Sequence, residues 1–152
     1  MFRKTDTSNQ LSFYSSVLEH LTVSSSDQFS DETAWQNIFY KQVTSRINEN
    51  LFSVLFSSDN GAPNSSVRTL IGMMILKEGQ GYSDQKLFES CRFNLLTRKA
   101  LGLVNLNDPL PCESTYYFLR KRIENYFNKT GIDLFEKCFQ EISKEQIIEF
   151  NV

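Results

Sequence analysis

The chain has 152 residues, of which 40% are hydrophobic and 22% charged, and its formal net charge is −2. It contains only 6 Gly and 3 Pro, which argues against a β-sandwich with many turns. No apolar run approaches the length of a membrane span, and the first ten residues lack the apolar core of a signal peptide. We therefore expect a soluble cytoplasmic protein that has no membrane partner.

Apolar residues recur at three- and four-residue steps through most of the chain, which predicts helices. The first of these is a short amphipathic helix around residues 11–21. A longer helix is expected to begin near Ser30, with Asp31 and Glu32 in its first turn, where acidic residues are favourable. Its apolar stripe predicts that this helix continues without a break to about Phe56.

The middle of the chain carries clear start and stop signals. The polar segment 57–66 is the clearest loop, and Ser66 is the expected N-cap of an almost wholly apolar, buried helix. Ser83 is the expected N-cap of the next helix. Gly102 is the expected stop of a short helix over residues 94–101.

Two more helices are predicted after a proline-containing loop, the first of them capped by Ser114 or Thr115. The sequence thus predicts an all-α, compact multi-helix bundle. Residues 1–60 would form an N-terminal helical arm and residues 61–152 the main domain, the two making one compact unit. Residues 67–91 also have the outline of a helix-turn-helix, although the turn is longer than the usual tight one.

The three cysteines, Cys91, Cys112 and Cys138, are odd in number and show no CxxC spacing. This pattern argues against a disulfide framework and against a structural zinc site. Separate thiols in a reducing cytoplasm are the simpler interpretation. The single histidine, His20, has no suitable neighbours for a metal site. We expect no metal and no cofactor in this chain.

Charge is distributed unevenly, because residues 67–129 carry ten cations and six anions while both flanking segments are acidic. Three of these cations are consecutive, on a helix whose buried stripe is predicted to be Tyr116, Leu119, Ile123, Tyr126 and Phe127. On a helical wheel Lys121 lies opposite that stripe, and Arg120 and Arg122 lie on either side of it.

Aromatic residues accompany these cations, since Tyr117 and Phe118 fall on the same outer, basic side of the helix. Cations beside planar rings suit phosphate contact combined with stacking or groove contact. They also suit a protein interface. A helix that is simply packed on both sides is a third interpretation, and the residues alone leave all three open.

Several short motifs follow one another in this region. They are Gly81-Tyr82-Ser83-Asp84, Asn94-Leu95 with Arg98, Leu101-Gly102-Leu103, Asp108-Pro109-Leu110-Pro111, Ser114-Thr115, and Phe118 with Arg120 and Arg122. With this order and spacing, the segment Val67 to Ile123 resembles the N-terminal domain of insertion-sequence transposases of the InsH type.

The resemblance implies a bacterial transposase domain that binds double-stranded transposon ends or supports the assembly of a transposase homodimer. The family's catalytic domain is RNase H-like, carries a metal-binding carboxylate triad and lies C-terminal to this region. We therefore expect this chain not to be an enzyme, and Mg²⁺ to be needed only by that catalytic domain. The candidate DNA-binding residues are Arg92, Arg98, Lys99, Arg120, Lys121 and Arg122.

Two alternatives stand beside DNA binding. Surface solvation explains Arg92, Arg98 and Lys99 equally well, and Tyr117 and Phe118 would suit a protein-protein or dimer interface. A stand-alone enzyme lacks support, because the sequence shows no Ser-His-Asp set, no phosphate-binding glycine loop and no metal-ligand spacing. The salt dependence of the affinity distinguishes DNA binding from a protein interface. Phosphate binding weakens steeply as the salt concentration rises, whereas apolar contact does not.

Overall fold

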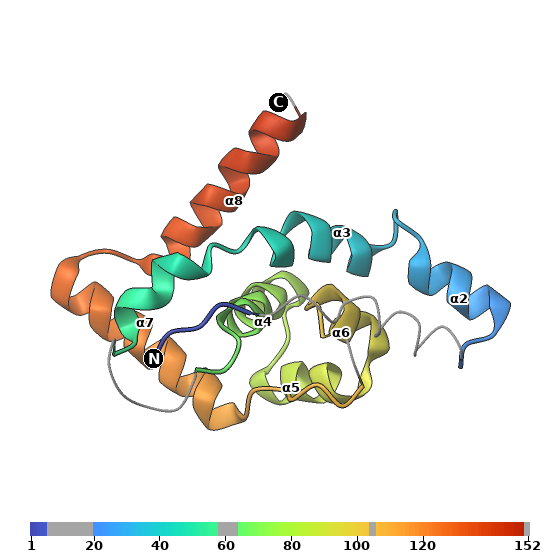
Figure 1. Cartoon of the computed structure of the whole chain (residues 1–152), viewed down its shortest axis with the longest axis horizontal. Coiled ribbons are helices and arrows are strands. Elements are labelled where there is room, and N and C mark those ends of the chain that lie inside the picture. The colour runs from blue at the N-terminus through green and yellow to red at the C-terminus, as the bar shows by residue number, and fades with distance from the viewer. Residues whose placement is uncertain (6–19, 58–63, 104–105, 151–152) are drawn as a thin grey trace.

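The structure is a computed structural model that describes residues 1–5, 20–57, 64–103 and 106–150. These residues form helices and contain no β-strand, which confirms the all-α prediction (Figure 1). The elements are α2 (Val23–Ser30), α3 (Trp35–Gln42), η1 (Thr44–Arg46), η2 (Glu49–Leu55), α4 (Val67–Gln80), α5 (Asp84–Phe93), α6 (Leu95–Ala100), α7 (Glu113–Thr130) and α8 (Leu134–Phe150). Most of the helix expected around residues 11–21 lies outside the described residues.

Helix α4 lies at the centre of the fold, with the other elements arranged around it (Figure 1). Its apolar side chains are buried, as its sequence predicts, except for Ile75, which is half-buried. The hydroxyl of Ser66 accepts a hydrogen bond from the Thr69 N–H at 3.1 Å, which confirms the predicted N-cap. Gly72 allows a close approach, because a Cβ there would lie 3.0 Å from Cδ2 of Leu101.

Segments from both sides of residues 58–63 contribute to one hydrophobic core. Ile47 and Phe52 precede these residues in the sequence, and they belong to the same buried cluster as Leu87 and Tyr116, which follow them. Helix α3 packs on α6, while η2 contacts α4, α7 and α8. The position of α7 is therefore set by contacts from both halves of the chain.

The predicted continuous helix from Ser30 to Phe56 is wrong. Helix α3 begins only at Trp35 and ends at Gln42, and two short 3₁₀ segments follow it. In one straight helix Thr44 and Glu49 would point in nearly opposite directions, yet both are buried here. The break lets each side chain face inward, because the chain turns between them. Tertiary contacts thus outweigh the local helical pattern.

Asp31 also differs from its predicted role. It was expected in the first turn of a helix, but it lies in the turn between α2 and α3. Its carboxylate accepts hydrogen bonds from the hydroxyl and the backbone N–H of Thr33, at 2.7 and 2.8 Å. These two bonds, the hydroxyl first, lower the pKa of Asp31.

Two of the predicted starts and stops near the basic helix are confirmed and one is wrong. The hydroxyl of Ser83 caps α5, and Gly102 follows α6 with a φ of 71°. Helix α7, however, begins at Glu113 with Cys112 at its N-cap, two residues before Ser114, the earlier of the two expected caps. The hydroxyl of Ser114 instead lies 3.0 Å from the Cys112 Sγ.

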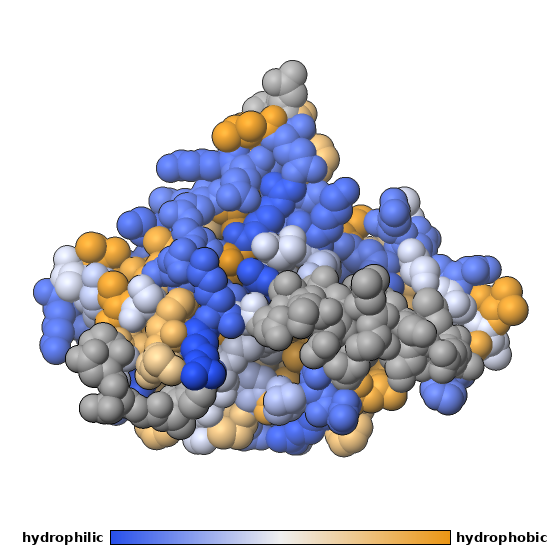
Figure 2. Space-filling view, viewed as in Figure 1, coloured by the Kyte–Doolittle hydropathy of each residue, from blue (hydrophilic) through white to orange (hydrophobic). Residues whose placement is uncertain are grey.

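Helix α8 extends from the body (Figure 1), and it exposes apolar residues at its far end. Leu134, Cys138 and Ile142 are buried as predicted, whereas Phe139, expected on the same side, is 45% exposed. Figure 2 shows hydrophobic atoms near the top of the molecule, at the far end of this helix. The exposed apolar residues there are Ile147, Ile148 and Phe150.

The helix-turn-helix interpretation of α4 and α5 stays a prediction.

Replacing Gly102 by alanine should lower the free energy of unfolding by about 1–3 kcal/mol, because left-handed backbone is unfavourable for alanine. In addition, the new Cβ would lie 2.7 Å from Cε2 of Tyr40. Chemical denaturation measures the effect. Gly79→Ala is the matched control, since a Cβ there meets nothing within 4 Å, and alanine inside α4 should stabilise the protein. Equal effects of the two changes would contradict this account of Gly102.

Candidate nucleic-acid interface

The basic triplet lies on α7, an 18-residue helix that begins after Pro111 and ends before Gly131, whose φ is 73°. Tyr116, Leu119 and Ile123 form its buried stripe, as predicted. Of the other two residues assigned to that stripe, Tyr126 is half-buried and Phe127 is 48% exposed. Because one narrow stripe anchors α7, most of its circumference faces solvent.

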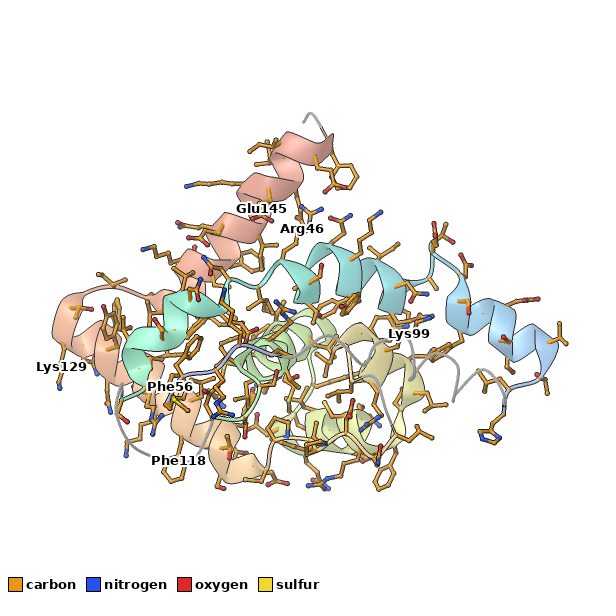
Figure 3. The ribbon with its side chains drawn as sticks, viewed as in Figure 1. Arg46, Phe56, Lys99, Phe118, Lys129 and Glu145 are labelled. Atoms are coloured by element: carbon orange, nitrogen blue, oxygen red, sulfur yellow. The ribbon has the colours of Figure 1, made fainter. Side chains whose placement is uncertain are left out.

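The side of α7 opposite the stripe is rich in cations, and Glu124 lies at its edge, three residues after Lys121. At 3.6 residues per turn this side, here called the α7 outer face, consists of Ser114, Phe118, Lys121, Asn125, Asn128 and Lys129, with Arg122 at its other edge. All seven residues are exposed. In Figure 3, the side chains of Phe118 and Lys129 both point away from the body, Lys129 from the C-terminal end of α7 and Phe118 from its N-terminal half. The two acids of α7, Glu113 and Glu124, fall beside Arg120 on the flank.

The three cations of the triplet have different surroundings. Arg120 Nη1 lies 3.8 Å from the Asp84 carboxylate, and its guanidinium is 5.7 Å from the centre of the Tyr116 ring. Arg122 turns to the other side, where its guanidinium lies over the Phe56 ring at 5.3 Å. Lys121 lies between them on the outer face. No carboxylate of the described residues forms an ion pair with Lys121, Arg122 or Lys129.

Asp84, the first residue of α5, contacts side chains of the two neighbouring helices α4 and α7. Besides Arg120, it contacts Lys77 Nζ at 3.7 Å and accepts a hydrogen bond from the Tyr117 hydroxyl at 3.1 Å. Burial, followed by the Asp84 carboxylate, raises the pKa of Tyr117. Arg120 and Tyr117 therefore hold α7 against α5. Phe118, the other predicted interface aromatic, is 64% exposed.

Arg92 is exposed, but it lies 3.6 Å from the Glu113 carboxylate at the start of α7. The pair joins the end of α5 to α7 at the protein surface, where such pairs contribute little to stability. Since a carboxylate already accompanies Arg92, a phosphate would have to compete with Glu113 for it.

Arg98 is only 5% exposed, so it is not available to a phosphate in this conformation. Its guanidinium donates hydrogen bonds to the carbonyl oxygens of Cys91 and Leu106, at 3.2 and 3.4 Å. Burial lowers the pKa of Arg98, and the Asp108 carboxylate acts in the opposite direction. These contacts fasten the loop that leads into α7 to the end of α5, and we remove Arg98 from the DNA-binding set.

Lys99 is also only 5% exposed and is removed from the set for the same reason. Its amine donates to the carbonyl oxygen of Phe29 and lies 4.0 Å from the centre of the Phe29 ring. Figure 3 shows Lys99 between α6 and the α3 side of the molecule. Lys99 therefore joins α6 to α2, across 70 residues of sequence.

Burial lowers the pKa of Lys99 from 10.5 to about 8. Because the unfolded chain binds this proton more tightly than the folded one, the contribution of Lys99 to the free energy of unfolding should rise as pH increases from about 8 toward 10. The full rise is about 1.4 kcal/mol per unit of pKa shift. Denaturant titrations of the protein and of Lys99→Met, across that pH range, measure the difference. A difference that stays constant with pH would contradict this assignment.

Sequence reasoning missed three exposed cations near α7. Lys129 follows Arg122 by seven residues, a spacing that places both on one helix face. Arg3 and Lys4 are exposed in the first residues of the chain, and nothing in their own sequence shows where that segment packs. The helical spacing could have identified Lys129, whereas the other two required the tertiary structure.

The other residues considered for special chemistry are separate from one another. Cys91 and Cys138 are buried and Cys112 is exposed, all as free thiols. Within the described ranges, no group of three or more His, Cys, Asp or Glu side chains is placed to hold a metal ion. In the same ranges, no helix combines the length and the apolar character that a membrane crossing needs.

The fold and this surface together define an all-helical domain with a long, exposed basic helix. Residues 26–122 match the family described as Transposase domain (DUF772), and the chain belongs to this family. The match includes elements on both sides of residue 60 and reaches Arg122 on α7. Neither a curated protein nor a solved structure matches the chain. Membership confirms the expected transposase character; the InsH type stays a prediction.

Proposed function

We propose that this transposase domain binds the phosphates of duplex DNA, at transposon ends, through the α7 outer face. One observation carries the proposal: the longest helix of the described chain presents Lys121, Arg122 and Lys129 to solvent, and no carboxylate of the described residues forms an ion pair with them. In a chain whose net charge is −2, this is a local concentration of positive charge. Lys and Arg side chains that neutralise phosphates supply most of the affinity of non-specific DNA binding.

The neighbours of these cations suit the same partner. Asn125 and Asn128 are exposed amides that can donate to phosphate oxygens or to base edges. Phe118 can stack on a base or contact a sugar. Of the predicted contact residues, Lys121 and Arg122 remain in the proposed site. Arg92 and Arg120 are secondary, because each already contacts a carboxylate.

The proposed role of the domain is binding rather than cleavage. Cations and amides hold phosphates in position, but cutting the DNA backbone in the resembling transposases depends on carboxylates that bind divalent metal. We therefore propose that Mg²⁺ acts in a separate catalytic domain. We also propose that the protein acts in a bacterial cytoplasm, because that is where its DNA partner would be. A nicking assay with this chain, Mg²⁺ and supercoiled DNA tests the point, and nicked product would contradict it.

Assembly of a homodimer is the second candidate function. The observation that favours it is the exposed apolar end of α8, where Ile147, Ile148 and Phe150 are 53%, 79% and 57% exposed. Phe118 adds an exposed aromatic on α7. A second copy of the chain that covered these residues would remove apolar surface from water.

Fluorescence anisotropy with a labelled duplex, at about 50 and about 200 mM salt, separates the two functions. If three phosphates are neutralised, the affinity should fall roughly 40-fold between these concentrations. Sedimentation of the chain alone gives its mass at the same salt concentrations. Absence of DNA binding at low salt, together with a dimer, would replace DNA binding by assembly.

A further inference from the structure

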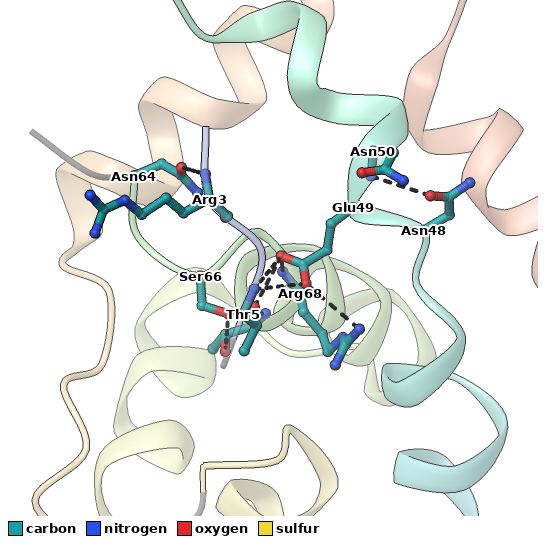
Figure 4. Close-up of polar contacts among 9 residues, drawn as sticks. Arg3, Thr5, Asn48, Glu49, Asn50, Asn64, Ser66 and Arg68 are labelled. Carbon is teal, nitrogen blue, oxygen red and sulfur yellow. Dashed lines mark hydrogen bonds and ion pairs between the residues drawn. The ribbon is translucent and has the colours of Figure 1, made fainter. Parts of the chain in front are cut away.

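The first residues of the chain form an extended strap, residues 1–5, that is attached to the body at Glu49. Glu49 is only 3% exposed, and its carboxylate accepts hydrogen bonds from the backbone N–H and the hydroxyl of Thr5, each at 3.0 Å. The Thr5 hydroxyl also lies 2.7 Å from the hydroxyl of Ser66, the N-cap of α4. Figure 4 shows these contacts converging on Thr5.

The strap has a second attachment two residues earlier. The Arg3 backbone N–H donates to the side-chain oxygen of Asn64 at 2.7 Å, and the Asn64 amide donates back to the Arg3 carbonyl at 3.2 Å. Both bonds use the backbone of Arg3, so its side chain stays exposed, as does Lys4. In Figure 4 the Arg3 side chain extends away from the Glu49 cluster.

Ring contacts place the strap beside the α7 outer face. Phe2 packs on Phe56 with ring centres 5.8 Å apart. The guanidinium of Arg122 lies over the same Phe56 ring at 5.3 Å. Phe56 is therefore shared by the strap and by α7, and Arg3 directly follows Phe2 in the strap.

A buried carboxylate is costly unless hydrogen bonds and a cation offset its loss of hydration. Arg68 lies 3.6 Å from Glu49, and Thr5 supplies two donors. Two of the hydrogen bonds to Glu49 come from Thr5. Without the strap, the buried carboxylate would therefore lack these two donors. This arrangement fixes the position of the strap on the body.

We propose that the strap is a second part of the DNA-binding surface, in which Glu49 and Asn64 are positioning residues that hold Arg3 and Lys4 beside Arg122 to contact phosphates of the same duplex. The proposal rests on the proposed function. It assigns two further cations, far from α7 in sequence, to the partner that α7 binds. With five cations in place of three, the surface should neutralise about two more phosphates, each steepening the slope of log affinity against log salt by about 0.9.

Salt titrations of duplex binding, followed by anisotropy, test the strap with three variants. Arg3→Gln/Lys4→Gln removes its charges. Thr5→Val/Asn64→Ala keeps every cation but removes one donor to Glu49 and both bonds to Arg3. Lys121→Gln/Arg122→Gln/Lys129→Gln tests the outer face itself. Denaturation of each variant confirms that it remains folded.

We expect the first variant to make the slope shallower by about 2, and the second to lose at least half as much although its charge is unchanged. A wild-type slope in the first variant, beside a shallower one in the outer-face variant, would overturn the strap proposal and leave the proposed function standing. A wild-type slope in the second variant alone would overturn the positioning role. A wild-type slope in the outer-face variant would contradict the proposed function instead.

Discussion

Replacing Arg98 by alanine should lower the free energy of unfolding by on the order of 3 kcal/mol, because the buried carbonyl oxygen of Cys91 and the partly buried carbonyl oxygen of Leu106 would each lose a charged donor. Arg98→Lys should also destabilise the protein, since a single amine cannot reproduce the planar guanidinium that reaches both carbonyls. Arg92→Ala is the matched control, because its ion pair with Glu113 is exposed and should contribute little. Chemical denaturation measures all three.

The same variant separates a structural arginine from a DNA-binding one. Under conditions in which the Arg98→Ala variant is folded, its slope of log affinity against log salt for duplex binding should equal that of the wild type. The reason is that the Arg98 side chain is buried. An unchanged unfolding free energy combined with a shallower salt slope would show that Arg98 contacts phosphate. That result would also require the loop that contains Leu106 to open.

Removal of the three outer-face cations should have the largest effect on binding. Lys121→Gln/Arg122→Gln/Lys129→Gln should weaken duplex affinity roughly tenfold or more near physiological salt, and make the salt slope shallower by between about 2 and 3. Glutamine keeps a flexible stem and a good helix propensity, so α7 should persist. Anisotropy titrations at several salt concentrations give both quantities.

The control for this experiment removes the same charge elsewhere. Lys41, Lys137 and Lys144 are exposed lysines on α3 and α8, and their joint change to glutamine alters the net charge equally. If affinity depends only on net charge, the two triple variants will bind equally weakly, contrary to the proposal. We expect the control variant to bind nearly as well as the wild type.

Helix ends were predictable where a single local residue decides them. Ser66 and Ser83 cap α4 and α5 through hydrogen bonds to residues three positions later, so a short window contains the whole signal. Gly102 is similar, because its left-handed backbone is a local requirement. The break after Gln42 was not predictable in this way, since the apolar pattern continues through it.

The roles of the cations depend on contacts that are distant in sequence. Arg98 and Lys99 look like exposed cations at the end of a short helix, and only the position of Phe29, 70 residues earlier, shows that Lys99 is buried. Glu49 stands between two other polar residues, Asn48 and Asn50, so its immediate sequence gives no sign that it is buried. Its partner Thr5 lies 44 residues away, so the strap could not be predicted from the sequence.

Lysine footprinting with and without duplex DNA is the measurement that tests the α7 outer face most directly. Acetylation of each lysine is measured by mass spectrometry at saturating DNA and low salt. We expect Lys121 and Lys129 to be protected, while Lys137 and Lys144 keep their full reactivity. If Lys121 and Lys129 remain as reactive with DNA as without it, α7 does not contact the duplex and the central claim is wrong.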